Sequence, residues 1–268
     1  MKVIYIAGCT HGGTTLLHRL LGAMAGVHSL GSVKNLPSTR GRVCSCGERL
    51  ERCKYWCLVL SELERGGDAE RVFENINAHD GHTFEMANCR LFQAAQVAAN
   101  CSVLVDSSRK VHRLRKLKDY CPNLDLRVVH LFRRPEAQVY SWMRREPDTV
   151  TNLAHRYVRE HRAIEREVGK CAQRNVLTCT FSYEDLCKDP MTALRTLSAL
   201  ADVQCEPDML TNWGQQEHHV LGGNRMLKST SSEITVDERW KWSLGQDVVD
   251  EVESVCSETM DHLHKKLR

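Results

Sequence analysis

The sequence predicts an α/β protein in which helices cover both faces of a parallel sheet, giving three layers. Short apolar runs rich in β-branched residues alternate along the chain with longer segments of helical periodicity. A glycine-spaced loop lies between the first apolar run and the first helical segment, which is the layout of a phosphate-binding loop. No linker or composition break divides the 268 residues, so we expect one domain over residues 1–268.

The elements follow from the pattern of apolar residues. Buried parallel strands are predicted over residues 3–7, 102–105 and 126–132, with a fourth candidate strand at 176–181. Helices are predicted over residues 14–24, 54–65, 83–100, 111–120, 136–145, 150–170 and 246–267. Residues 28–56 and 206–240 are irregular and are expected to form excursions. Because ligands bind at the carboxyl ends of strands in such sheets, functional residues are expected there.

The composition is that of an ordinary globular chain, with 42% hydrophobic and 26% charged residues. No apolar stretch is long enough to span a membrane. The net charge of +3 gives no reason to expect a nucleic-acid partner. The chain enters its first predicted strand at once and leaves no room for a signal peptide, so we expect a cytoplasmic protein without a membrane span.

The loop after the first strand is the strongest functional signal. Its sequence is Gly8-Cys9-Thr10-His11-Gly12-Gly13-Thr14-Thr15. Backbone N–H groups in such a loop and the following helix N-terminus favour an anion. The lysine with which an NTPase contacts its β and γ phosphates is replaced by Thr14, which argues against a triphosphate donor. Taken alone, the loop is also compatible with an ordinary turn between a strand and a helix.

This loop resembles the 5′-phosphosulfate loop of sulfotransferases, which use 3′-phosphoadenosine 5′-phosphosulfate (PAPS) as donor. The resemblance implies a P-loop NTPase-like sulfotransferase fold, adenosine 3′,5′-bisphosphate (PAP) as product, and no metal. It also implies that the whole loop, residues 8–15, binds the donor. His11 stands where the family places lysine or arginine against the leaving group, which implies a catalytic role. An imidazolium can do this work, and its charge is tunable near neutral pH.

A second motif follows the strand at 126–132. Arg133 ends the strand, Pro135 suits the first turn of a helix, and Tyr140-Ser141-Trp142 follows within that helix. This stretch is similar to the family's Arg-Asp-Pro…Tyr-Ser-Trp, whose arginine and serine hold the 3′-phosphate of the donor. The resemblance therefore assigns that phosphate to Arg133 and Ser141, and an arginine can fork onto a phosphate. Arg134 stands where the family usually has aspartate.

A third motif, Asp106-Ser107-Ser108-Arg109, ends the strand at 102–105. It is similar to an Asp-Ser-Ser-Lys stretch of a sulfotransferase subgroup. The resemblance implies that Ser108 and Arg109 lie near the phosphosulfate and that Arg109 neutralises its charge. The other cations that follow are typical of a solvated helix face.

Two later stretches complete the resemblance. Residues 183–186 are similar to the family's Tyr-Glu-Asp-Leu, which implies that Tyr183 lies beside the adenine. Residues 219–240 resemble its closing His…Gly-Asn-Pro and Asp-x-x-Trp region, which implies that Gly223 and Asn224 contact the nucleotide. The five motifs occur in order over nearly the whole chain.

The acceptor side departs from the family. Related enzymes carry Gly-Glu after the first helix and use the glutamate as general base, whereas this chain has Gly31-Ser32. Either Asp106 or His219 serves instead, or catalysis is impaired.

Three hypotheses follow: a sulfotransferase acting on a hydroxyl or amine by metal-free in-line displacement, a PAPS-binding protein with impaired catalysis, and a P-loop kinase. The acceptor is left open among small molecules, carbohydrates, lipids and peptides, and no oligomeric state is indicated.

The chain has 13 cysteines, spread through apparent strands and helices as in Cys89, Cys101, Cys179 and Cys256, where a buried free thiol acts as a small hydrophobe and a disulfide framework is not expected. Cys44, Cys46, Cys53 and Cys57 lie close together. Four thiols can bind zinc, but Cys-x-Cys-x6-Cys-x3-Cys lacks the paired Cys-x-x-Cys of ordinary zinc sites. A similar Cys-Ser-Cys-Gly…Cys-x-x-Trp stretch occurs in a bacterial sulfotransferase subgroup. We therefore interpret the cluster as a subgroup marker in a loop flanking the site, with zinc and a conditional disulfide as alternatives.

Overall fold

The computed structural model describes residues 1–39, 44–67, 69–206, 208–221, 225–228 and 230–267. Within them, a five-stranded sheet has the order β2-β3-β1-β4-β5, and all neighbouring strands are parallel. The strands are β1 (Lys2–Gly8), β2 (Val27–Gly31), β3 (Val103–Arg109), β4 (Asp125–Phe132) and β5 (Leu177–Ser182).

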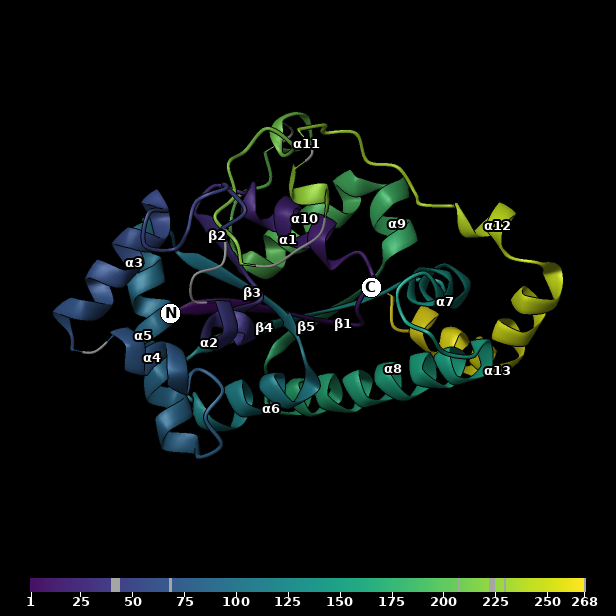
Figure 1. Cartoon of the computed structure of the whole chain (residues 1–268), viewed down its shortest axis with the longest axis horizontal. Coiled ribbons are helices and arrows are strands. Elements are labelled where there is room, and N and C mark those ends of the chain that lie inside the picture. Colours follow the sequence, from purple (N-terminus) through teal and green to yellow (C-terminus); the bar gives the residue numbers. More distant parts are fainter. Residues whose placement is uncertain (40–43, 68, 207, 222–224, 229, 268) are drawn as a thin grey trace.

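Helices cover both faces of this sheet (Figure 1). One face carries α1 (Thr14–Gly22), α9 (Tyr183–Lys188) and α10 (Pro190–Ala201). The other carries α5 (Gly81–Ala99), α6 (Val111–Tyr120) and α8 (Val150–Gln173). Around this second layer pack α3 (Lys54–Arg65), α4 (Ala69–Asn75), α7 (Pro135–Met143) and α13 (Gln246–His264). Short turns of helix are α2 (Leu36–Thr39), α11 (Met209–Asn212) and α12 (Trp240–Ser243).

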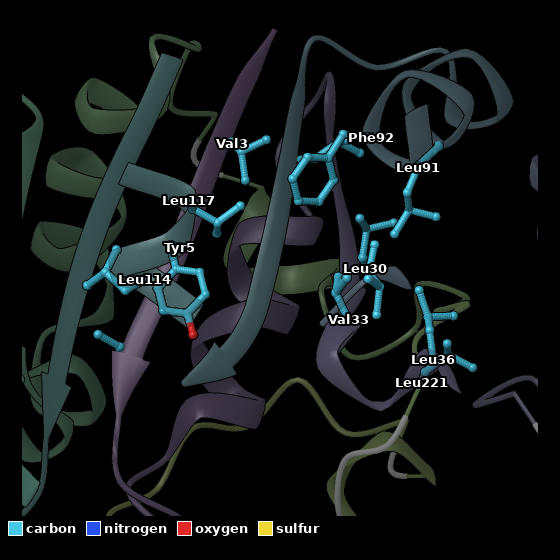
Figure 2. Packing of buried hydrophobic residues seen from close by; sticks show 14 of the residues in the cluster. Val3, Tyr5, Leu30, Val33, Leu36, Leu91, Phe92, Leu114, Leu117 and Leu221 are labelled. Carbon is cyan, nitrogen blue, oxygen red and sulfur yellow. The ribbon is translucent and has the colours of Figure 1, made fainter. Parts of the chain in front are cut away.

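The central strand β1 shows why the sheet is buried. Its side chains alternate between the two faces, so Val3 and Tyr5 enter one core while Ile4 and Ile6 enter the other. All four side chains are fully buried. Figure 2 shows Val3 and Tyr5 within the first core. An apolar strand covered on both faces is typical of parallel sheets between helical layers.

The four predicted strands and seven predicted helices are confirmed, with ends shifted by a few residues. Strand β3 continues to Arg109, four residues beyond its predicted end. The prediction stopped early because it followed apolar residues, whereas the last part of the buried strand holds the polar residues Asp106, Ser107 and Ser108. The prediction that residues 28–56 are irregular is wrong at the start of this range. Strand β2 begins at Val27 and contains His28 and Ser29, whose polarity hid a strand at the sheet edge.

Helices α4 and α9 were also not predicted, since each is shorter than two helical turns. The second excursion, residues 206–240, is mostly irregular as expected, and contains α11 and a 3-10 turn at Arg225–Lys228. Among the described residues, no helix combines the length and the apolar character needed to cross a bilayer.

Candidate active site

A cavity of about 780 Å³ opens where β1, β3 and β4 end. Its wall takes residues from the loop after β1, the ends of β3 and β4, helix α7 and the segment before α12. The predicted functional residues in this wall are Thr10, His11, Gly13, Thr14, Thr15, Arg109, Arg133, Ser141 and Tyr183. The parallel sheet therefore brings together at one edge residues that lie far apart in the sequence.

Helix α1 presents an open N-terminus to this cavity. Gly13 precedes it in the left-handed conformation, with φ of 89°. No side chain of the described residues caps the helix, and its first turn holds no acidic residue. Thr14 and Thr15 are buried in the same turn. Uncapped N–H groups at the positive end of a helix dipole form an anion site.

Two close approaches explain the glycines of the loop. A Cβ on Gly13 would lie 2.3 Å from Cδ2 of Tyr183, and a Cβ on Gly8 would lie 2.7 Å from the Leu131 carbonyl oxygen. Gly12 donates its N–H to the Cys9 carbonyl at 3.3 Å, which closes the turn. A side chain at Gly8 or Gly13 would push the loop away from its neighbours.

Helix α7 fixes the same loop from the other side. Trp142 Nε1 donates to Thr10 Oγ1 at 2.8 Å, and Gln138 Nε2 donates to the Thr10 carbonyl at 3.0 Å. Ser141 lies on this helix beside Trp142 and lines the cavity. The two predicted phosphate sites, on the loop and on α7, thus belong to one rigid unit.

Arg133 is buried at the end of β4, where it makes several contacts. It forms an ion pair with Asp237 at 3.1 Å and donates to the carbonyl oxygens of Asp237 and His11 at 3.0 and 3.3 Å. Its guanidinium lies 4.7 Å from the centre of the Tyr183 ring. Its buried Nε has no hydrogen-bond partner among the described residues. One donor of a desolvated cation is therefore unused, which is unfavourable without a ligand.

Tyr183 connects this arginine to the segment that covers the cavity. Its hydroxyl donates to the Thr235 carbonyl at 3.4 Å and accepts the Asp237 N–H at 3.3 Å. Burial raises the pKa of Tyr183, so the phenol stays protonated. Arg239 and Arg133 hold the pKa of Asp237 well below its usual value, so Asp237 is ionised. Residues 235–239 therefore line the cavity and are held there by polar contacts.

His11 lies in the loop with a positive φ of 65° and lines the cavity. Burial lowers the pKa of His11 from its usual value near 6.5, and the charges of Arg145 and Arg109 lower it further. The imidazole is therefore mainly neutral at pH 7 in the free protein. An anion bound against His11 would oppose these effects and favour its protonation.

The other predicted loop residues, Gly8, Cys9 and Gly12, do not line this cavity. Gly8 lines a smaller neighbouring cavity, and Cys9 is buried with its Sγ 3.4 Å from Nε2 of His161. Ser108 is buried and donates its hydroxyl to Asp106, while Ser107 lines the cavity in its place. Ser108 was predicted to lie near the phosphosulfate because it belongs to the family-like motif at the end of the predicted strand. Gly223 and Asn224 lie outside the described residues.

Asp106 does not reach the cavity. Its buried carboxylate accepts hydrogen bonds from Arg113 Nε at 2.8 Å and from the Ser108 N–H at 2.9 Å. This ion pair ties the end of β3 to helix α6. The structure therefore places Asp106 in a supporting position, because its oxygens are engaged away from the cavity wall.

His219, the other alternative base, also lies elsewhere. Its Nδ1 is 3.2 Å from the Sγ of Cys53, and the ring does not line the cavity. Ser32 does line it, and its buried hydroxyl has no hydrogen-bond partner within the described part of the chain. Neither of the two bases considered from the sequence is placed to replace the family glutamate.

Sequence reasoning missed His18 and Arg145, both of which line the cavity. His18 lies one helical turn after Thr14, so helical spacing could have found it. Its Nδ1 is 3.2 Å from Ser29 Oγ. Burial, together with the nearby His218 and Arg19, lowers the pKa of His18 to about 3, so the ring is neutral. Asp237, which the sequence identified only as the aspartate of the Asp-x-x-Trp motif, also lines the cavity.

The sheet, the open helix N-terminus and the cationic cavity define an α/β fold of the P-loop-like type. The profile of the sulfotransferase family matches residues 4–207. The chain therefore belongs to the sulfotransferase family. A comparison with curated proteins gives no significant match.

Solved sulfotransferase structures share the fold. The sulfotransferase domain from the curacin biosynthetic pathway is 16% identical, with a TM-score of 0.58 and 97% of each chain covered. The sulfotransferase domain of the Synechococcus PCC 7002 olefin synthase is 18% identical, with a TM-score of 0.54, covering 95% of this chain and 94% of that one. A mouse sulfotransferase, SULT7A1, complexed with PAP, is 12% identical, with a TM-score of 0.53, covering 97% and 84%.

Proposed function

We propose that the protein transfers the sulfuryl group of PAPS to a hydroxyl or amine acceptor. The observation that carries this proposal is that a buried arginine with an unused Nε, Arg133, lines the same cavity as the uncapped N-terminus of α1. A ligand with phosphate groups at two positions matches these two anion sites. The family and the mouse sulfotransferase structure with PAP support the choice of nucleotide.

The charges of the wall suit a polyanion. His11, Arg109, Arg133, Arg145 and Arg239 line the cavity, against the carboxylates of Asp237 and Glu238. In the described part of the chain, neither Arg109 nor Arg145 forms an ion pair, whereas Asp237 pairs with both Arg133 and Arg239. The cavity thus holds uncompensated positive charge that a phosphosulfate would neutralise.

In the proposed complex, the first turn of α1 binds the 5′-phosphosulfate through its N–H groups, with Thr14 and Thr15 as hydroxyl donors. In-line displacement places growing negative charge on the departing phosphate, so stabilisation of that charge lowers the barrier. Arg109 lines the cavity and supplies positive charge to it, and His11 adds positive charge once the bound anion favours its protonation. This mechanism requires no metal at the reacting atoms.

Arg133 and Ser141 would hold the 3′-phosphate, as the family resemblance implies. The free Nε of Arg133 supplies one donor without breaking its ion pair with Asp237. The ring of Tyr183, packed against Arg133, offers a surface for the adenine. Gly223 and Asn224 are retained in this proposal as nucleotide contacts.

We propose that the acceptor binds against the part of the cavity wall that contains Ser32 and His18. His18 is present in the neutral form that can accept a proton. A base with a pKa of about 3 is weak near neutral pH, so slow transfer to alcohols is expected. The acceptor class stays among small molecules, carbohydrates, lipids and peptides.

The experiment is to incubate the protein with sulfur-labelled PAPS and a panel of phenols, alcohols, amines, sugars and peptides. A sulfotransferase forms labelled product and PAP without added magnesium. Binding of PAP without any labelled product, even after prolonged incubation, would instead support a PAPS-binding protein. Magnesium-dependent phosphoryl transfer from ATP would support a kinase.

A further inference from the structure

Three cysteines and one histidine converge at one point outside the proposed active site. Cys44, Cys46 and Cys53 come from the excursion after β2, and His219 comes from a segment far along the chain. Their sulfur atoms and one ring nitrogen all lie within 4.8 Å of one another. Cys44, Cys53 and His219 are buried, and Cys46 is partly buried. We propose that these four residues form a structural zinc site.

Three of the separations between the donor atoms are close to the edges of a tetrahedron. The Sγ atoms of Cys46 and Cys53 are 3.7 Å apart. Nδ1 of His219 is 3.2 Å from the Sγ of Cys53 and 4.0 Å from that of Cys44. In tetrahedral coordination, Zn–S bonds of about 2.3 Å and Zn–N bonds of about 2.0 Å place sulfurs about 3.8 Å apart and sulfur and nitrogen about 3.5 Å apart. Since all four donor atoms lie within 4.8 Å of one another, modest side-chain shifts would bring them onto one zinc ion.

The backbone around the cysteines holds them in positions suited to metal ligands. Gly47, with φ of 95°, donates its N–H to the Cys44 carbonyl at 2.9 Å, so Cys44 and Cys46 share one tight turn. Cys53 is the N-cap residue of helix α3, and its side chain makes no capping hydrogen bond to the helix. The positive end of the helix dipole favours a thiolate at that position.

His219 is oriented by its neighbours as a metal ligand would be. Its backbone carbonyl accepts a hydrogen bond from Trp56 Nε1 at 2.8 Å, and its ring stacks on Tyr55 with centroids 5.9 Å apart. While Nδ1 faces the sulfurs, Nε2 lies 3.6 Å from a carboxylate oxygen of Glu217. A carboxylate on the outer nitrogen of a metal-bound histidine is the usual arrangement, and Lys54 in turn pairs with Glu217.

The structure revises the zinc alternative considered from the sequence. Cys57 is not part of the cluster, because its Sγ turns to the Glu51 carbonyl at 2.8 Å. His219 takes its place, so the donor set is three thiolates and one imidazole, which is common in structural zinc sites. A disulfide between any two of the cysteines would leave a third thiol and the imidazole unused.

Zinc at this point would hold one wall of the active-site cavity. Ser45 donates its N–H to the Val220 carbonyl at 3.2 Å, and Ser32 donates its N–H to the Leu221 carbonyl at 3.2 Å. Gly31, Ser32 and Leu221 line the cavity. With four protein ligands the zinc has no open position, so its role is to tie residues 44–53 to residues 219–221.

The test is to purify the full chain from zinc-supplemented medium under reducing conditions and measure its metal content. We expect one zinc per chain, with X-ray absorption showing three sulfur and one nitrogen ligand. C53S and H219A should lose the zinc, whereas the matched control C57S should keep it. H219C should retain zinc and convert its coordination to four sulfurs, which a purely structural role of the histidine would not produce.

Wild-type protein without stoichiometric zinc, or zinc coordinated without these sulfurs, would overturn the proposal. So would zinc loss in C57S together with retention in C53S. If C53S or H219A fails to fold, the absorption spectrum of the wild type and the ligand exchange in H219C still decide the matter. The result does not depend on sulfuryl transfer, because metal content is measured without donor or acceptor.

Discussion

Two regions of the cavity are built on different principles. The donor region comprises residues 8–15, the end of β4 and helix α7, and each part joins a strand directly to the helix that follows it. The proposed acceptor wall comprises Gly31 and Ser32 at the end of β2 together with Leu221, and backbone contacts and the cysteine cluster join these residues to residues 44–53 behind them. The donor region is therefore encoded locally, whereas the acceptor wall depends on contacts between distant parts of the chain.

The two regions also differ in polarity. The donor region presents an open helix end, His11 and Arg133, with Arg109 beside them. The acceptor wall presents Gly31, Ser32 and Leu221, none of which carries a charge. Leu221 belongs to the same apolar core as Leu30 and is seen there in Figure 2. We infer that the donor region recognises a common nucleotide and that the wall shapes the pocket for the acceptor.

The largest expected effect is at His11, which tests whether the donor region does chemistry or only binds. Removing one group that stabilises transition-state charge typically costs roughly 10²–10³-fold in kcat. We expect H11A to lose about that much kcat with little change in PAPS affinity, and H11R to recover part of the loss. Steady-state kinetics and equilibrium binding measure the two quantities.

The control for His11 is H155A, because His155 is exposed on helix α8. It should leave both quantities unchanged. Normal turnover in H11A would show that His11 is a bystander in the loop and that the donor region acts by positioning alone.

The next effect concerns Arg133 and sharpens the assignment of the 3′-phosphate. A charge-assisted hydrogen bond contributes about 1.5–3 kcal/mol, so R133A should weaken PAP binding roughly tenfold or more. R134A is the matched control, since Arg134 is adjacent and exposed. Isothermal titration of both variants with PAP checks this, and equal losses in the two variants would contradict a specific site at Arg133.

A smaller effect is expected on the acceptor wall. S32E restores a carboxylate at the position of the family base, and Ser32 lines the cavity. We expect turnover with alcohol acceptors to rise severalfold while PAP affinity stays nearly unchanged. Lower turnover in S32E would show that the native protein takes its base from elsewhere, and H18N would then be the first variant to assay.

The smallest effect is a pH dependence of nucleotide binding. In the free protein the pKa of His11 lies below its usual value, and a bound anion raises it. Between these two pKa values binding takes up a proton, so PAP affinity should increase as pH falls through this window and decrease as pH rises. Calorimetry in buffers of different ionisation enthalpy measures the uptake. H11R should show none, and identical uptake in H11R would assign the proton to another group.

The same contrast explains what could be predicted from the sequence. The strand–loop–helix unit at residues 3–24 and the placement of Arg133 were predictable, because parallel strands deliver their ends to one edge of the sheet. Ser107 and Ser108 are adjacent, and only packing decides which of them lines the cavity.

The acceptor wall was much less predictable. Strand β2 was hidden by polar residues at the sheet edge, and the partner of the cysteines, His219, lies 166 positions beyond Cys53 in the sequence. Proximity in the sequence placed Cys57 in the cluster, but its Sγ points to the Glu51 carbonyl, because proximity gives no information about the direction of a side chain. Contacts of this kind depend on the whole fold.

The most direct test of the central claim compares PAP with adenosine 5′-monophosphate (AMP) in titrations of the wild-type protein. The two ligands share the adenosine and the 5′-phosphate and differ only in the 3′-phosphate. If the open end of α1 and Arg133 form two phosphate sites in one cavity, PAP should bind at least roughly tenfold more tightly than AMP, a difference of about 1.4 kcal/mol or more. Equal affinities would show that the cavity has no 3′-phosphate site and would contradict its assignment to PAPS.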